Sequence, residues 1–109
     1  QPLLKPLEDI PKMAELAEKM VHKALDSFVK RDAALARALW EDEEKADGYR
    51  DLVQDELTAI MTRDPSSASR AIPLILIARH LERIADHATN IAEDVVYMVE
   101  GKVIKHAPK

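Results

Sequence analysis

The sequence has no cysteine and only two glycines, and aromatic residues make up 4% of its 109 residues. The lack of cysteine excludes disulfides, thiolate metal sites and a cysteine nucleophile, so any metal must be held by oxygen or imidazole ligands. The scarcity of glycine and aromatic residues argues against a turn-rich β fold. The longest apolar run, residues 71–78, contains Pro73 and is far shorter than the roughly 20 residues that cross a bilayer.

Residues 1–101 contain no long segment in which charge of one sign is concentrated. The formal net charge is −4, and basic residues are scattered among acidic ones, so no nucleic-acid partner is expected. Residues 1–11 lack the basic region and continuous apolar stretch of a secretory signal. We therefore expect a cytoplasmic protein. Residues 102–109 form a locally basic tail, which we interpret as a frayed terminus.

Apolar residues recur at three- and four-residue steps in three parts of the chain. This pattern predicts three amphipathic helices, at about residues 9–30, 33–62 and 65–100. The predicted core positions are Met13, Leu16, Ala17, Met20, Ala24 and Phe28 in the first helix, Leu35, Ala38, Leu39, Ala46, Tyr49, Val53, Leu57 and Ile60 in the second, and Ile77, Leu81, Ile84, Ala88, Ile91, Val95 and Val99 in the third.

Proline and aspartate residues mark where these helices begin. Pro11 suits the first turn of the first helix, where its missing N–H is not needed. Asp32 is a good N-cap for the second helix, and Asp64 followed by proline repeats that signal for the third. Pro73 lies inside the third helix, which predicts a bend in its early turns or a later start near Ala71.

The connections between the predicted helices are short, so neighbouring helices must run antiparallel. We therefore predict an all-α fold, an antiparallel up-down-up three-helix bundle that forms a single domain over residues 1–109. Three long helices leave apolar surface uncovered. A second three-helix unit is expected to pack alongside, either within the same natural polypeptide or as a dimer partner.

Two pairs of acidic residues share the same four-residue spacing, Glu43 with Asp47 and Glu82 with Asp86. Four residues turn a helix by about 40° beyond a full turn, so each pair places both carboxylates on one face. Hard cations bind several oxygens at once, and two such pairs on adjacent helices can hold a metal between them. The predicted metal-ligating residues are Glu43, Asp47, Glu82 and Asp86, with Asn90 and Glu93 as neighbours.

On a helical wheel these acidic residues lie away from the predicted core positions, so we expect them to be exposed. Exposure argues against a buried catalytic acid, and solvated surface charge is an alternative interpretation of the same pattern. A ferritin-like metal site is excluded, because none of the four histidines has a glutamate three positions earlier. His80 and His87 leave a phosphotransfer role as a further alternative. No Ser/His/Asp set, P-loop or glycine-rich fingerprint is present, and we expect no enzyme.

Three segments resemble the PhoU family of phosphate-uptake regulators. The family's signature helix is similar to residues 78–101, ARHLERIADHATNIAEDVVYMVEG, with ERI-x-DHA-x-NIAE at its centre. The helix that opens the second PhoU repeat is similar to residues 9–32, DIPKMAELAEKMVHKALDSFVKRD. The following helix, with its acidic-x-x-x-Asp motif, is similar to residues 41–52, EDEEKADGYRDL, although Glu43 stands where the family more often has aspartate.

The resemblance implies two tandem three-helix repeats that bind multinuclear iron or zinc clusters at the surface. The ligands would be Glu43, Asp47, Glu82 and Asp86, with Asn90 and Glu93 beside them. The implied function is negative control of phosphate uptake and of the phosphate-starvation response, through the ATPase subunit of the phosphate ABC transporter and a sensor histidine kinase. A membrane would be reached only through the transporter.

One departure from the family is that this chain resembles a single repeat, the second. We expect a fragment of a two-repeat protein, or a short homologue that forms a homodimer. Two other functions remain open: a carboxylate metal-handling protein or enzyme, and a purely structural helical adaptor. A catalytic carboxylate cluster should be buried and have shifted pKa values, whereas an adaptor's should be exposed.

Overall fold

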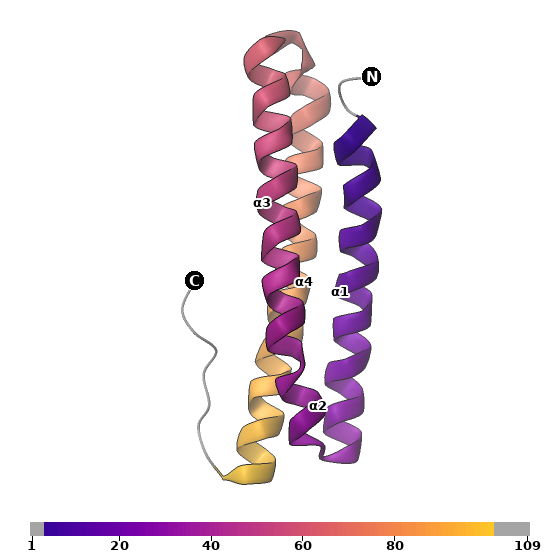
Figure 1. Cartoon of the computed structure of the whole chain (residues 1–109), viewed down its shortest axis with the longest axis vertical. Helices are drawn as coiled ribbons and strands as arrows, with labels where there is room; N and C mark the ends of the chain where they lie inside the picture. Colours follow the sequence, from indigo (N-terminus) through magenta and orange to yellow (C-terminus); the bar gives the residue numbers. More distant parts are fainter. Residues whose placement is uncertain (1–3, 102–109) are drawn as a thin grey trace.

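The structure is a computed structural model that describes residues 4–101. Figure 1 shows three long helices side by side, with the first and last running in one direction and the middle one in the other. The predicted all-α, up-down-up bundle is therefore confirmed for the described residues; the predicted basic tail lies outside them. The elements are α1 (Leu4–Lys30), α2 (Ala33–Arg37), α3 (Leu39–Arg63), the 3-10 turn η1 (Pro65–Ser67) and α4 (Ala68–Glu100).

The helix boundaries differ from the predicted ones in three places. α1 already includes Leu4, so Pro11 lies inside the helix and not in its first turn. The second predicted helix is interrupted at Ala38 and forms α2 and α3. α4 begins at Ala68 and continues through Pro73, whose side chain is exposed. Proline removes one backbone hydrogen bond, and the carbonyl that it leaves free can bind water on an exposed face.

The predicted cap at the start of the second helical segment is present. The side chain of Asp32 accepts a hydrogen bond of 3.0 Å from the backbone N–H of Leu35. The side chain of Asp64 likewise accepts from the backbone N–H of Ser66, at 3.2 Å. Both aspartates satisfy donors that lack a partner in the first turn of a helix, which favours the start of a new helical segment at each point.

Two apolar clusters form the core, one at each end of the bundle. α1 contributes methionines to both clusters, whereas α4 contributes mainly alanines. One cluster comprises Met20, Ala24, Ala36, Leu39, Ala46, Ala85, Ala88, Ala92, Val95 and Val96, and the other comprises Met13, Val53, Leu57, Ile60, Ala71 and Ala78.

The predicted core face of α4 is wrong in part. Ile77, Ile84, Ile91 and Val99 are exposed, and the buried face is turned toward the alanines that follow the three isoleucines. Alanine lets neighbouring helices approach closely, so the helix buries its small residues and leaves the larger ones outside. Phe28 of α1 and Ala38 before α3 were also expected in the core and are exposed.

Three packed helices leave three grooves between them, and these grooves differ in chemistry. Carboxylates and arginines line the groove between α3 and α4, lysines surround the groove between α1 and α3, and large apolar side chains lie exposed along α1 and α4. None of the helices within residues 4–101 is long and apolar enough to cross a membrane.

Candidate metal centre

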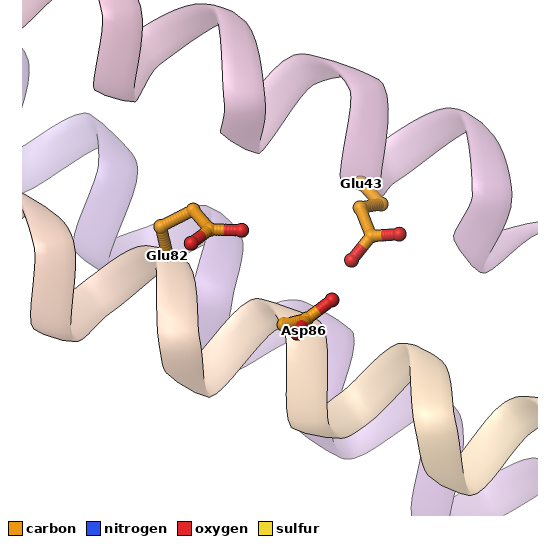
Figure 2. Close-up of side chains that lie close together, drawn as sticks. All are labelled: Glu43, Glu82 and Asp86. Carbon is orange, nitrogen blue, oxygen red and sulfur yellow. The ribbon is translucent and has the colours of Figure 1, made fainter. Parts of the chain in front are cut away.

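The antiparallel packing of α3 against α4 brings the two acidic motifs together. Figure 2 shows Glu43 of α3 facing Glu82 and Asp86 of α4. One carboxylate oxygen from each of the three residues lies within 4.8 Å of the other two. Oxygen ligands on opposite sides of an ion lie about 4–5 Å apart when each metal–oxygen distance is about 2.0–2.4 Å. The three carboxylates can therefore ligate a single cation.

The burial of this cluster corrects the expectation of an exposed acidic strip. Glu43 is 1% exposed, and the side chains of Asp47 and Glu82 are 17% and 19% exposed. Asp86 is exposed, as predicted. Alanines next to the cluster allow α3 and α4 to approach closely, so side chains at the edge of the contact are covered. A helical wheel drawn for each helix alone does not include this covering.

The cluster is crowded with negative charge. Burial raises the pKa of Glu82; the nearby Arg50 guanidinium opposes this shift, and the charges of Asp47 and Asp86 add to it. The raised pKa means that the surroundings disfavour the charged form of Glu82, and a cation nearby would stabilise that form. An ion held by this cluster would neutralise the repulsion.

Arg50 is the cation that the chain itself places in this cluster. Its Nη1 atom lies 3.8 Å from Asp47 Oδ1 and 3.6 Å from Glu82 Oε1, and its Nη2 atom lies 3.1 Å from Asp51 Oδ1. Arg50 was not among the predicted site residues. Its position three residues after Asp47 is the signal that could have identified it, because that spacing places both side chains on one face of a helix.

The remaining predicted site residues lie around the three converging carboxylates. Asp47 is one turn after Glu43 and its charge helps raise the pKa of Glu82, but it is not one of the three residues whose oxygens converge. Asn90 is exposed and Glu93 is partly buried, one and two turns further along α4. The structure therefore brings three of the six predicted residues, Glu43, Glu82 and Asp86, within ligand distance of one another.

The groove beside the cluster is open and polar. A depression of about 490 Å³ adjoins Glu82 and Asp86, and it is not an enclosed apolar pocket of the kind that holds most small-molecule substrates. Two further arginines, Arg79 and Arg83, line this depression. The sequence did not predict either of them as a site residue. His80 and His87, considered for phosphotransfer, are exposed residues of α4 that do not line this depression.

Comparison with known proteins identifies the class to which this helical bundle and its carboxylate cluster belong. The profile of the PhoU domain matches residues 10–95, and the chain belongs to the PhoU family.

Relatives with curated names are similar over most of this chain. It is 40% identical over 105 residues to the phosphate-specific transport system accessory protein PhoU homolog 2 of Thermotoga maritima, covering 96% of this chain and 45% of the relative. It is 42% identical over 89 residues to a PhoU homolog of Pseudomonas aeruginosa, covering 82% and 37%. A homolog of Aquifex aeolicus is 39% identical over 106 residues, covering 97% and 48%. This chain thus spans less than half the length of these relatives.

Proposed function

We propose that this chain acts in negative control of phosphate uptake and of the phosphate-starvation response, by binding other proteins in the cytoplasm. The main support is membership of a family whose relatives are named as accessory proteins of a phosphate-specific transport system. The open polar groove along α3 and α4 supports a binding role over catalysis. The proposed partners are the ATPase subunit of the phosphate ABC transporter and a sensor histidine kinase.

A direct binding measurement tests this role. The purified 109-residue chain should bind the purified ATPase subunit from the same organism, and Asp47→Asn with Asp86→Asn should weaken that binding if the acidic groove is involved. Isothermal titration calorimetry gives the affinity for each protein. No binding to either the ATPase or the cytoplasmic part of the kinase would contradict the proposed role.

We also propose that a metal ion binds at the cluster of Glu43, Glu82 and Asp86. The support is the convergence of three carboxylate oxygens in a partly buried setting that raises the pKa of Glu82. The resemblance to the family implies iron or zinc in a multinuclear cluster, for which Asp47, Asn90 and Glu93 would be further ligands. When bound, such an ion supplies positive charge that joins α3 to α4.

Metal content measured on protein purified without chelators or an affinity metal tests this proposal. Glu43→Gln and Asp86→Asn should each lower the bound metal by about tenfold or more, because each removes one of few anionic ligands. Asp94→Asn is the matched control, since Asp94 is an exposed acid of α4 outside the cluster. Equal metal content in all variants would contradict a site at this cluster.

A second three-helix unit is proposed to pack against α1 and α4. Ile84 follows Glu82 by two residues, and Leu25 follows Lys23 by two residues. Two residues turn an α-helix by about 200°, so each apolar side chain points nearly opposite to its charged neighbour. Because Glu82 and Lys23 both face α3, the apolar residues lie on the opposite side of the α1–α4 pair. The exposed apolar residues on this side are Leu7, Leu25, Phe28, Ile77, Ile84, Ile91 and Met98.

The length of the relatives supports this second unit, since each is more than twice as long as the part matched here. In the present chain another copy would take its place. Light scattering should therefore show a dimer, and Ile84→Glu should favour the monomer. Leu52→Glu is the matched control, because Leu52 is a similarly exposed residue on α3. A chain that is monomeric at every concentration would contradict pairing between copies.

One observation favours a second candidate function, a carboxylate metal-handling protein or enzyme. Glu43 is buried and the pKa of Glu82 is raised, which are properties of catalytic carboxylates as well as of ligands. Metal-dependent redox or hydrolytic turnover that disappears in Glu82→Gln would support this candidate. Binding of the ATPase by protein from which metal has been removed would instead support the regulatory role.

A further inference from the structure

The groove between α1 and α3 lies on the other flank of α3 from the candidate metal centre. A depression of about 290 Å³ opens there between Lys12 and Lys19 of α1 and Lys45 of α3, with Leu16 and Tyr49 among its lining residues. We call this surface, together with its extension described next, the lysine groove. It combines an apolar floor with positively charged edges.

The depression continues across α3 into a second one of similar volume. The second depression is also about 290 Å³ and shares Lys45 and Tyr49 with the first. It extends over Gly48 and Leu52, and Leu52 is 43% exposed. The lysine groove therefore runs from α1 over the outer face of α3, and its floor can accept an apolar stripe from another molecule.

The lysines of this groove form no salt bridge within the part of the chain that the structure describes. Among residues 4–101, no ion pair involves Lys12, Lys19 or Lys45. Glu15 is the one acidic residue in the lining, so lysines outnumber acids by three to one there. The whole chain carries a net charge of −4, so this positive surface is local. Unpaired lysines around an apolar floor favour a partner that carries both carboxylates and apolar side chains.

The packing of the residues that the structure describes does not require glycine at position 48. Gly48 lies inside α3 with an ordinary helical backbone, and a Cβ atom added there would meet no atom within 4 Å. Glycine inside a helix destabilises it relative to alanine. Neither backbone conformation nor internal contact offsets that cost. A glycine between Lys45 and Leu52 on an exposed face lets the backbone of another molecule approach α3 closely.

We propose that the lysine groove docks an amphipathic helix of another protein, with aspartate and glutamate along its edges. A groove between two packed helices has the shape to receive a third helix, whose apolar residues enter the groove and whose charged residues lie at its rim. Leu16, Tyr49 and Leu52 would contact the apolar stripe of that helix, and the lysines would pair with its acids. The inference does not depend on the metal centre, and it gives the proposed regulator a defined docking surface.

A designed peptide tests this docking surface without knowledge of the natural partner. The peptide has about 15 residues, enough to form a helix in a favourable groove, with leucines at i, i+3, i+4 and i+7 and glutamates beside them. The control peptide carries lysine in place of glutamate. In fluorescence anisotropy with the 109-residue chain at low salt, the acidic peptide should bind at least about tenfold more tightly than the basic one.

Substitutions at Gly48 and Lys45 then locate the binding. Lys45→Glu should weaken the acidic peptide by about tenfold, since it converts an attraction into a repulsion. Gly48→Gln should weaken both peptides by filling the approach to α3. Circular dichroism should show unchanged helix content, because no neighbouring atom restricts a side chain at Gly48. Gly48→Ala is the matched control and should bind more nearly like the wild type.

Several outcomes would overturn the proposal. Equal binding of the acidic and basic peptides would exclude recognition by the lysines. Unchanged binding in both Gly48→Gln and Lys45→Glu, with loss in Ile84→Glu, would place the contact on the apolar face of α1 and α4. Binding of vesicles rich in phosphatidylglycerol, with no binding of the acidic peptide, would assign the lysines to a lipid surface.

Discussion

The two flanks of α3 both bury carboxylates, but only the flank that faces α1 provides each buried one with its own lysine. Asp9 accepts a hydrogen bond of 2.8 Å from Lys5, and Asp42 accepts one of 2.7 Å from Lys23. Asp9 and Asp42 are almost fully buried, while their lysines keep contact with water. The Lys23–Asp42 pair joins α1 to α3, and the Lys5–Asp9 pair lies within α1; neither needs an added ion.

The flank that faces α4 has a different balance of charge. Glu43, Glu82 and Asp86 converge there, and Arg50 is shared between Glu82, Asp47 and the exposed Asp51. Removing charges from water is costly unless they are compensated. The contrast teaches that burial alone does not mark a functional carboxylate. A cluster of at least partly covered acids that share one paired cation is the more informative feature, and it distinguishes the candidate metal centre from the structural pairs.

The largest expected effect tests the structural pairs. Lys23→Met leaves Asp42 buried without its cation, and we expect a loss of about 2–3 kcal/mol in the free energy of unfolding, near the lower limit for a broken buried pair because Lys23 is partly exposed. Denaturant unfolding at neutral pH measures it. Lys19→Met, one turn away and without an ion pair, should change stability by less than about 0.5 kcal/mol. Similar losses in both variants would show that Lys23 contributes through packing alone.

The next effect tests the opposite flank. A divalent ion at about a hundred times its dissociation constant should raise the free energy of unfolding by about 2.7 kcal/mol if it binds the folded state alone. Thermal unfolding with and without zinc or ferrous iron measures this stabilisation. Glu43→Gln should greatly reduce it, whereas Lys23→Met should retain it, since Lys23 lies on the flank facing α1. Equal stabilisation of wild type and Glu43→Gln would remove the distinction between the flanks.

The sequence was sufficient to predict the helices and which acidic residues face one another across the α3–α4 groove. Apolar periodicity and the caps at Asp32 and Asp64 located the helical segments, because these signals depend on residues close together in the chain. The acidic motifs met across the groove as expected, since antiparallel neighbours place Glu43 opposite Glu82 and Asp86. Both inferences need only local spacing and the direction of each helix.

The rotation of α4 could not be predicted in the same way. Size and hydrophobicity favour Ile77, Ile84 and Ile91 as core residues, but the bundle buries alanines there because close packing of three helices requires small side chains. The burial of Glu43 has the same cause. Arg50 was missed because its contact with Glu82 depends on distances between helices. Each of these features is set by packing across elements, which a helical wheel does not contain.

A smaller effect concerns the outer surface of the flank facing α1. Gly48→Ala should raise the free energy of unfolding by about 0.5–1 kcal/mol, because alanine favours the helix and its Cβ meets no neighbouring atom. Denaturant unfolding of the two proteins measures the difference. Gly101→Ala is an informative contrast: Gly101 ends α4 with φ of 70°, where a side chain is strained, and stability should fall. A loss of stability in Gly48→Ala would show that α3 needs glycine there for its own packing.

The smallest effect is a pH dependence at Glu56, a partly buried acid on the flank facing α1 that lies near both Asp9 and Lys5. Burial raises the pKa of Glu56 above its usual value of 4.5, a hydrogen bond and charge from Asp9 raise it further, and Lys5 opposes the shift. The folded state then holds this proton more tightly than the unfolded state. Its stabilising contribution is complete below the unfolded-state pKa and is lost as pH rises through the folded-state pKa.

Urea unfolding at a series of pH values measures this effect. Above pH 4.5 the free energy of unfolding should fall less steeply with pH in Glu56→Gln than in wild type. The exposed Glu44→Gln should follow the wild type. An unchanged slope in Glu56→Gln would mean that Lys5 neutralises both acids, and the matching of charges on this flank would then be complete.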